Sequence, residues 1–300
     1  MNDKMLNKAM AKITERRQHA NDRARENLLK AYTAPEFKEL YNAQRETEIE
    51  LARKQAYGED FSNEQAKLVE ISLKQEFCLR QLGLNSTDLY PNYECKDCND
   101  TGYKMGYMCD CLKKEINKEL LAYSGFTHRL ASFEDNQYNP PVSDLLKKWC
   151  NTKSNKINIL ISGNTGTGKT FLTECVANEL IKKNKLLLFT TAFNMNNTLL
   201  NYHISFDSTR EQIIKPYLES QVLIIDDLGT EPMIKNVTCE YLYLILNERM
   251  LNNLPTIITT NLDINDILAH YGERVFSRIS NKKISLLINL ENDDLRLKNE

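Results

Sequence analysis

A glycine-rich octapeptide, GNTGTGKT from Gly163 to Thr170, constrains the fold of this chain more than any other segment. It matches the pattern G-x-x-x-x-G-K-[ST], in which backbone N–H groups converge on nucleotide phosphates. Such a loop joins a buried strand to a helix, because the helix N-terminus directs its positive dipole at the phosphates. The apolar segment 156–161 and the helical spacing of residues 171–180 supply that context, which a glycine-rich surface turn would lack. We therefore expect an α/β fold in which a parallel sheet is flanked by helices.

The loop predicts a set of nucleotide-binding residues. Lys169 can reach the β and γ phosphates as a point charge, and Thr170 offers its hydroxyl to Mg²⁺. Glycine is frequent in the loop because a Cβ would hold the phosphate oxygens away from the backbone. The predicted nucleotide-binding residues are Gly163, Asn164, Thr165, Gly166, Thr167, Gly168, Lys169, Thr170 and, from a later strand, Asp226.

A second apolar run, residues 222–225, predicts a central strand that is covered on both faces. Asp226 at its end is expected to hold Mg²⁺, directly or through water, and Asp227 to polarise the attacking water. Two acidic residues that only end a strand and begin a loop are the alternative. A third strand over residues 255–260 leads to Asn261, whose amide could hydrogen-bond the attacking water or the γ-phosphate.

Two arginines follow in the segment GERVFSRI. Arg278, or Arg274 as the alternate, could be donated across a subunit interface to the γ-phosphate bound by a neighbouring copy. A surface ion pair is the alternative interpretation of either side chain. Together with Asp227 and Asn261, Arg278 completes the predicted catalytic set.

Four of the eight cysteines cluster in the sequence. Cys95 and Cys98 form a C-x-x-C pair, and Cys109 and Cys111 form a C-x-C pair. Four thiolates at this spacing suit one tetrahedral Zn²⁺ in a closed, structural site. An iron–sulfur cluster, a redox dithiol and unligated buried cysteines are the alternatives. The remaining thiols are interpreted as ordinary core or surface side chains: Cys78, Cys150, Cys175 and Cys239.

The chain has four regions of different composition. Residues 1–88 are highly charged and predict a helical module, and residues 89–112 form the predicted zinc knuckle. Residues 113–150 are a linker, and residues 151–300 alternate apolar strands with helices, as in a parallel α/β domain. Helices are expected near residues 3–31, 36–56, 63–82, 112–123 and up to Cys150, with a turn over 136–141 and a polar tail after Asn292.

Two apolar stripes are expected on the helices of residues 1–88. The stripe on the first helix consists of Leu6, Met10, Ile13 and Arg17, and the stronger one on the third helix consists of Val69, Leu73, Phe77 and residues 79–82. Coiled-coil pairing, a solvated helix that packs only on a partner, and a plain helical appendage are the three interpretations of this module.

Composition limits the location and the partners of the protein. The content of hydrophobic residues, 41%, is sufficient for a core. No apolar run approaches the roughly 18 residues of a membrane span, and the N-terminus leads into polar sequence rather than a signal peptide. We therefore expect a cytoplasmic protein that does not enter a membrane. A net charge of −2 argues against a surface coated for tight non-specific DNA binding, and leaves room for a local basic groove.

Taken together, GNTGTGKT, LIIDDLGTE, TIITTN and GERVFSRI resemble the AAA+ ATPases of the DnaC/DnaI/IstB group, over residues 150–290. The resemblance implies an AAA+ P-loop NTPase core that hydrolyses ATP with Mg²⁺. It also implies that Asn261 is the sensor-1 residue and that Arg278 is the arginine finger. Most AAA+ proteins carry Glu where Asp227 stands, so turnover is expected to be slow. No helical lid with a sensor-2 arginine is found after residue 280.

The N-terminal half is similar to bacterial and phage replicative helicase loaders of the DnaI-related type, because a charged helical segment precedes ECKDCNDTGYKMGYMCDCLKK. This resemblance implies an ATP-dependent loader in replication initiation. Its N-terminal module would bind the hexameric helicase, and its AAA+ domain would bind ATP and single-stranded DNA and self-associate. The alternative is a transposition helper of the IstB type that acts on duplex DNA, although these helpers normally lack the knuckle. A nucleotide kinase or GTPase is disfavoured by the Asp226-Asp227 strand end and the absence of N-K-x-D.

Residues that could contact single-stranded DNA lie between a strand predicted over residues 186–189 and the strand that ends at Asp226. Aromatic rings stack on bases and cations neutralise phosphates, but ordinary helix packing explains the same side chains equally well. The candidates are Phe193, Tyr202, His203, Arg210 and Lys215.

Overall fold

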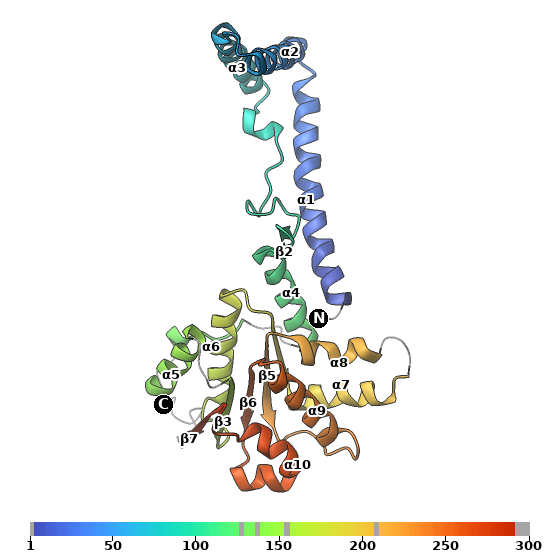
Figure 1. The fold of residues 1–300 in the computed structure, drawn as a ribbon, viewed down its shortest axis with the longest axis vertical. Coiled ribbons are helices and arrows are strands. Elements are labelled where there is room, and N and C mark those ends of the chain that lie inside the picture. The colour runs from blue at the N-terminus through green and yellow to red at the C-terminus, as the bar shows by residue number, and fades with distance from the viewer. Residues whose placement is uncertain (1–2, 126–128, 136–138, 153–156, 207–209, 292–300) are drawn as a thin grey trace. The chain divides into compact units, whose positions relative to one another are not determined.

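A computed structural model describes residues 3–125, 129–135, 139–152, 157–206 and 210–291. The chain divides into two compact units, one over Ala11–Tyr107 and one that combines Met1–Met10 with Met108–Glu300 (Figure 1). The polar tail expected after Asn292 lies outside the described residues. Within the described ranges, no helix has both the length and the hydropathy needed to cross a lipid bilayer.

Three long helices account for most of the N-terminal region, close to the predicted bounds. They are α1 (Asp3–Ala31), α2 (Pro35–Tyr57) and α3 (Ser62–Gln81), followed by the short helix η1 (Ser86–Leu89) and the hairpin strands β1 (Tyr103–Lys104) and β2 (Tyr107–Met108). Pro35 occupies the first turn of α2, where its missing N–H costs no hydrogen bond. Gly58 ends α2 in the left-handed conformation, with φ of 71°. α2 and α3 pack together around buried Phe37 and Leu79.

The apolar stripe predicted on the third helix is mostly not its buried face. Val69, Leu73 and Phe77 are 62%, 64% and 64% exposed, whereas Leu79 is buried. The reason is that α3 packs on α2 through a different face of the helix, which also buries Glu64 against α2. The stripe predicted on the first helix starts one residue late, since the buried side chains there are Met5, Ala9 and Ile13.

The second unit is built on a five-stranded sheet in the order β4-β5-β6-β3-β7, and all of its pairings are parallel. This confirms the predicted parallel α/β fold. The strands are β3 (Asn158–Gly163), β4 (Leu187–Thr191), β5 (Val222–Leu228), β6 (Thr256–Thr260) and β7 (Ser285–Leu290). The helices are α4 (Asp110–Tyr123), η2 (Phe133–Asp135), α5 (Pro140–Asn151), α6 (Lys169–Lys182), α7 (Ala192–Ile204), α8 (Arg210–Glu219), α9 (Thr238–Leu251) and α10 (Ile264–Ile279).

Helices cover both faces of the sheet. Alternate residues of each strand point to opposite sides, so the apolar side chains on each face are buried only if both faces are covered. Figure 1 shows α5 and α6 on one side and α9 and α10 on the other. On the α6 side, Ile159 and Ile161 of β3 are buried together with Leu172 and Val176 of α6. On β5, five successive residues, Val222 to Asp226, are buried, as expected for a central strand covered on both faces.

Two local predictions are corrected by the structure. The strand predicted over 156–161 runs from Asn158 to Gly163, because Gly163 still pairs with Leu290 of β7, and residue 156 lies outside the described residues. Of the turn expected over 136–141, Pro140 and Pro141 instead begin α5, where proline is pre-organised for the first helical turn. Residues 136–138 lie outside the described residues. In the described part of the chain, α10 is followed by β7 and by no further helix.

Candidate nucleotide site and cysteine cluster

The predicted phosphate loop lies between β3 and α6, as the motif requires. Gly163 is held close to the neighbouring strand, since a Cβ at this position would lie 2.5 Å from the Leu290 carbonyl oxygen. Gly168 precedes α6 with φ of 89°, a conformation that other residues rarely adopt. Lys169 begins the helix, is 5% exposed, and its Nζ donates hydrogen bonds to the carbonyl oxygens of Gly163 and Asn164 at 2.8 and 2.7 Å. The lysine is thus positioned over its own loop.

Asp226 connects the phosphate loop to two strands of the sheet. Its carboxylate accepts hydrogen bonds from the hydroxyls of Thr170 at 2.9 Å and of Thr259 at 2.6 Å. Asp226 is 3% exposed, and this burial raises the pKa of its carboxyl group; the Thr259 hydrogen bond acts in the opposite direction. The negative charge of Asp227 also raises the pKa of Asp226. A buried carboxylate beside a threonine hydroxyl is a donor set that Mg²⁺ prefers.

The two acidic residues at the end of β5, Asp226 and Asp227, lie in a β-bulge. The register of β5 with β6 shifts between Ile225 and Leu228, and Asp227 takes φ of 55°. In a regular strand two successive side chains point to opposite faces, whereas a bulge re-aims them. The backbone N–H of Asp227 donates to the Thr259 hydroxyl at 2.8 Å, so Thr259 orients both acidic residues. Thr259 is not among the residues predicted from the sequence, although its place on β6, two residues before Asn261, could have suggested it.

Asn261 lies directly after β6 and is exposed to solvent. It lines a cavity of about 420 Å³ together with Gly163 and Asn164 of the phosphate loop. The structure therefore brings the predicted sensor-1 residue to the same edge of the sheet as the loop. The side chain that reaches the Asp226 carboxylate, however, is that of Thr259.

A second buried carboxylate, which sequence analysis did not select, supports the loop after β5. Glu231 is 4% exposed and accepts hydrogen bonds from the backbone N–H of Gly229 at 2.9 Å and from the Tyr271 hydroxyl. Burial, followed by the charge of Glu231, raises the pKa of Tyr271. The same Tyr271 lies in α10 immediately before Gly272, where the helix kinks. The contact therefore ties the strand-end loop to the helix that carries the two candidate arginines.

Arg274 and Arg278 both contact α9 in their own chain. Arg274 is exposed and lies 3.8 Å from a Glu240 carboxylate oxygen. Arg278 donates hydrogen bonds to the Asn247 side-chain oxygen at 3.2 Å and to the Tyr243 hydroxyl at 3.3 Å. Both guanidinium groups lie over the Tyr243 ring, at 4.0 and 5.1 Å from its centroid. A surface ion pair thus describes Arg274 better than Arg278.

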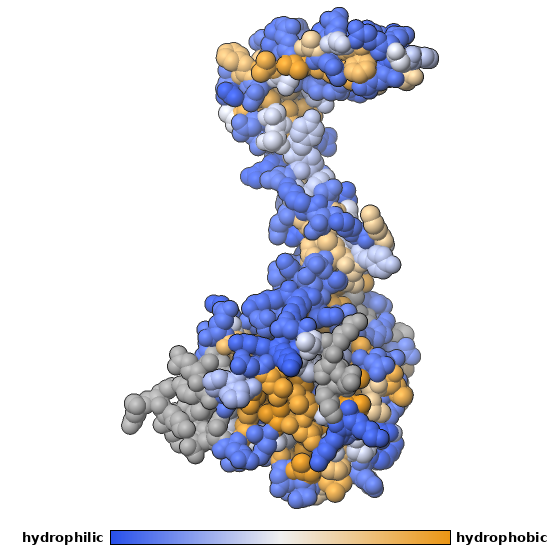
Figure 2. Space-filling model, turned by 60° about the vertical axis from the view of Figure 1, so that its left-hand side comes forward, coloured by the Kyte–Doolittle hydropathy of each residue, from blue (hydrophilic) through white to orange (hydrophobic). Residues whose placement is uncertain are grey.

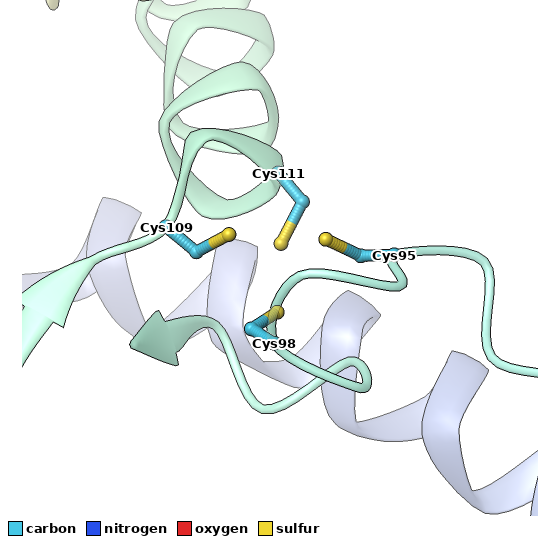
Figure 3. Close-up of side chains that lie close together, drawn as sticks. All are labelled: Cys95, Cys98, Cys109 and Cys111. Carbon is cyan, nitrogen blue, oxygen red and sulfur yellow. The ribbon is translucent and has the colours of Figure 1, made fainter. Parts of the chain in front are cut away.

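The four predicted metal ligands come together (Figure 3). The sulfur atoms of Cys95, Cys98, Cys109 and Cys111 all lie within 4.8 Å of one another, and the side chains point toward a common centre. A tetrahedral Zn²⁺ with Zn–S bonds of about 2.3 Å would hold its sulfurs about 3.8 Å apart, so the arrangement fits this ion. Cys109 precedes α4 and Cys111 lies in its first turn, which explains the C-x-C spacing.

Asp100 orders the loop that carries the first two of these cysteines. Its buried carboxylate accepts hydrogen bonds from the backbone N–H groups of Glu94 and Cys95 at 2.8 and 3.0 Å, and from Arg16 at 2.6 Å. Burial by itself would raise the pKa of Asp100, but the hydrogen bonds from Cys95, Glu94 and Arg16 lower it below its ordinary value. The carboxylate therefore remains ionised and fixes the conformation of the loop through these hydrogen bonds.

Of the four remaining thiols, Cys78 and Cys175 are buried, and Cys150 and Cys239 are partly buried. Burial raises the pKa of Cys150 and of Cys175 to about 12. The pKa values of Cys78 and Cys239 are also raised, again mainly by burial. Their positions agree with the interpretation that they are ordinary thiols, because a reactive cysteine needs a lowered pKa.

Most of the candidate DNA-contacting side chains make contacts within their own chain. Arg210 lies over the Tyr202 ring, 4.5 Å from its centroid, and His203 forms a hydrogen bond with the Tyr241 hydroxyl at 2.9 Å. Lys215 lies 3.9 Å from an Asp3 carboxylate oxygen, and Phe193 is 50% exposed. Packing therefore accounts for much of this group, and Phe193 is more exposed than Tyr202.

Comparison with known proteins identifies the family of the segment that carries the phosphate loop. The family of IstB-like ATP binding proteins matches residues 130–300, which is more than half of the chain. The chain belongs to this family. The predicted resemblance to AAA+ ATPases of the DnaC/DnaI/IstB group is thereby confirmed for the part that carries the phosphate loop. The helical N-terminal region and the cysteine cluster precede the segment that the IstB-like family covers.

Two curated relatives of this IstB-like protein are named as replicative helicase loaders. DnaI of Bacillus subtilis (strain 168) is 30% identical over 147 residues, which cover 48% of this chain and 43% of DnaI. DnaC of Escherichia coli (strain K12) is 27% identical over 127 residues, which cover 42% of this chain and 51% of DnaC. The chain thus spans about half the length of these relatives. A crystal structure of DnaI matches 59% of this chain and 92% of the solved chain, with a TM-score of 0.44 and 22% identity.

Proposed function

We propose that this chain is an ATP-hydrolysing loader of the replicative DNA helicase, which acts when replication begins. The observation that carries the proposal is the combination of an IstB-like ATP-binding unit, similar to DnaI and DnaC, with a helical and cysteine-rich N-terminal region. In this proposal the ATP-binding unit controls when the N-terminal region holds the helicase. The proposed location is the cytoplasm, and single-stranded DNA is a further proposed ligand of the ATP-binding unit.

In the proposed reaction, Lys169 neutralises charge on the β and γ phosphates, and Thr170 and Asp226 hold Mg²⁺. The hydrogen bond between Thr170 and Asp226 supports this, because it brings the two ligands together. Asp227 polarises the attacking water and Asn261 contacts the water or the γ-phosphate. Aspartate is shorter than the glutamate that most AAA+ proteins carry at this position, so we expect slow turnover that increases on assembly.

We further propose that the ATP site is completed by a second copy of the chain. Arg278, with Arg274 as the alternate, would approach the γ-phosphate bound by its neighbour and stabilise charge in the transition state. Both arginines lie on the last turns of α10, after Gly272, where Arg274 is exposed and Arg278 is partly exposed. This position is consistent with the proposed role. Self-association through the AAA+ units is therefore part of the proposed function.

The proposed helicase-binding surface is the exposed stripe on α3, formed by Val69, Leu73 and Phe77. The three residues follow one another at intervals of four, so they lie on one face of the helix. Figure 2 shows hydrophobic side chains at the surface of the module formed by α2 and α3. Large apolar side chains gathered on a surface mark an interaction site more often than scattered ones do. A partner that buries this stripe would supply the apolar cover that α2 does not give.

The cysteine cluster is proposed to bind one structural Zn²⁺ through all four thiolates. A closed Cys₄ set leaves no position for substrate, so the metal would stabilise the fold and take no part in ATP hydrolysis. The short hairpin between Cys98 and Cys109 buries little of its apolar surface, since Tyr103, Met105 and Tyr107 are exposed. Metal binding, on the order of 10 kcal/mol, would offset the cost of ordering it.

The test is a binding measurement between the full-length protein and the cognate replicative helicase, with and without ATP. The double variant Leu73→Asp/Phe77→Asp should weaken helicase binding at least tenfold. Leu251→Asp is the matched control, because Leu251 is equally exposed, at 65%, but lies on α9. Failure of the unmodified protein to bind the helicase in either condition would reject the loader function. Equal losses in both variants would reject the α3 stripe as the contact surface.

A transposition helper that acts on duplex DNA is the second candidate, favoured by the IstB-like family match itself. Such a protein should cluster on double-stranded DNA in an ATP-dependent way and should ignore the helicase. The same purified protein can therefore be assayed on duplex DNA by light scattering. Clustering on duplex DNA together with no helicase binding would select this alternative.

A further inference from the structure

One face of α9 contacts the turns of α10 that carry Arg274 and Arg278. Tyr243 and Asn247 are four residues apart on α9, as Arg274 and Arg278 are on α10, so each pair lies on one side of its helix. The Tyr243 ring lies between the two guanidinium groups and the body of α9, at 4.0 Å from that of Arg274 and 5.1 Å from that of Arg278. The same tyrosine also contacts Arg278 through its hydroxyl.

The charges of the contacts distinguish the two arginines. Arg274 lies near the carboxylate of Glu240, which compensates part of its positive charge. Arg278 donates hydrogen bonds to the neutral oxygens of its neighbour Ser277, at 3.0 Å, and of Tyr243 and Asn247. No carboxylate of the described residues lies within salt-bridge distance of it. Arg278 is therefore oriented without being neutralised. An arginine that must meet the phosphates of another molecule needs this combination, because a carboxylate partner would compete with the phosphate.

The same helix turns are tied to the strand-end loop of their own chain. Gly272 has φ of 77° and ψ of 170°, so the turns that carry the arginines leave α10 in a new direction. The hydroxyl of Tyr271, directly before this kink, donates a hydrogen bond to the Glu231 carboxylate, which also accepts one from the backbone N–H of Gly229. The kink is thus anchored to the strand-end loop through Tyr271. The contact with Tyr243 then constrains the position of the Arg278 guanidinium group.

We propose that Tyr243 and Asn247 are positioning residues that hold Arg278, and not Arg274, for donation to the ATP site of a second copy of this chain. The proposal rests on the proposed function, since it requires an ATP site that two copies share. Tyr243 and Asn247 do not touch the nucleotide. They act by limiting the rotamers of Arg278, and misplacement of a catalytic group by about 1 Å can lower a rate by about 100-fold.

The test compares steady-state ATP hydrolysis by full-length variants under conditions in which the unmodified protein self-associates. Tyr243→Leu removes both the ring and the hydroxyl, and kcat should fall about 10- to 100-fold while KM changes by less than about twofold. Tyr243→Phe keeps the ring and should stay within about fivefold of the unmodified kcat, because one neutral hydrogen bond is lost. Arg278→Ala should lose most of its kcat, and Arg274→Ala should lose less. Arg53→Ala, at an exposed arginine of α2, is the matched control and should keep the unmodified kcat.

Mixing experiments separate positioning from a general loss of structure. Asp227→Asn has an inactive site but an intact Tyr243 and Arg278, so it can donate Arg278 to a Tyr243→Leu copy. The mixture should hydrolyse ATP faster than the sum of the two variants. A mixture of Asp227→Asn with Arg278→Ala should behave in the same way. If the Tyr243→Leu mixture shows no gain while the Arg278→Ala mixture does, Tyr243 acts within its own site and the proposal is wrong.

The remaining outcomes distinguish the positioning role of Tyr243 from the shared ATP site on which that role depends. No gain in either mixture would reject the shared site, and with it the inter-subunit part of the proposed function. A normal kcat for Tyr243→Leu, with gain in the Arg278→Ala mixture, would reject only the positioning role. If thermal unfolding shows that Tyr243→Leu is not folded, Asn247→Ala is used in its place. The Asn247→Ala variant removes a side-chain oxygen that holds Arg278 and leaves the Tyr243 ring in place. A kcat unchanged in Asn247→Ala would then contradict the proposal.

Discussion

The Thr170 hydroxyl donates a hydrogen bond of 2.9 Å to the Asp226 carboxylate, which joins the first turn of α6 to the end of β5. Asp226 is 3% exposed, and its second oxygen accepts from Thr259. A charged carboxylate is therefore kept in a buried position by two hydroxyl groups. Burial of a charge costs stability, so this arrangement favours ligand binding at the expense of the fold.

Asp226→Asn is expected to stabilise the protein when nucleotide and Mg²⁺ are absent. Burial raises the pKa of Asp226, so the folded state binds a proton more tightly than the unfolded state does. The contribution of this group is therefore most favourable below the ordinary aspartate pKa and is lost as pH rises through the raised pKa. At neutral pH the variant should gain about 1 kcal/mol in free energy of unfolding, measured with urea. The gain should shrink toward about pH 4.

The same variant should lose the stabilisation that MgATP gives to the unmodified protein. Thermal unfolding with ATP plus Mg²⁺ and with ATP plus EDTA measures this directly. Asp266→Asn is the control, because Asp266 is an exposed carboxylate in α10 outside the site. A variant that is less stable than the unmodified protein, yet responds normally to Mg²⁺, would contradict both expectations.

Asp227→Asn should bind ATP normally and should lower turnover about 100-fold or more, since a carboxylate that polarises water is lost. Asparagine is the appropriate replacement, because Asp227 has φ of 55° and Asn tolerates this left-handed region well. Lys169→Ala provides the contrast, and should lower ATP affinity measured with a fluorescent nucleotide. If Asp227→Asn turns over at the unmodified rate, another group activates the water.

Zinc removal should expose a defined set of thiols. In the native protein, the reaction with a thiol reagent near neutral pH should be slow, because burial raises the pKa of the four single cysteines and zinc would occupy the others. Chelation should release one zinc per chain and the four thiols of the cluster, Cys95, Cys98, Cys109 and Cys111. Cys98→Ser should contain no zinc, whereas Cys239→Ser should retain it. Rapid reaction of all four cluster thiols in the untreated protein would argue against the site.

Arg249 should be one of the most sensitive positions for stability. It is fully buried, and its guanidinium donates to the carbonyl oxygens of Tyr217, Ser220 and Pro255 and to the Thr256 hydroxyl. Arg249→Met should lower the free energy of unfolding by about 3 kcal/mol or more, because several buried acceptors lose their donor. An exposed arginine, Arg53, is the control, and Arg53→Met should change stability by about 0.5 kcal/mol or less. Equal denaturation midpoints would show that water replaces these donors.

The sequence predicted the elements of the ATP-binding unit well, because strand, loop and helix follow one another within the motif itself. On α3 it predicted the apolar stripe of Val69, Leu73 and Phe77 but left open whether another helix of the chain or a partner covers that face, which is exposed in the structure. Periodicity shows which residues share a face of a helix. It does not show which of two apolar faces a neighbouring helix will cover, because that depends on the packing of α2 on α3.

By itself, the sequence determined the phosphate loop, the buried strand with its two acidic residues and the four clustered cysteines. These signals are local, since the backbone geometry of a glycine loop or a C-x-x-C pair depends on neighbouring residues. Only the tertiary structure decided that Thr259 holds Asp226 and that Tyr243 lies against Arg278. Such contacts join side chains 33 and 35 positions apart, so they exist only after parallel strands and packed helices have set the distances.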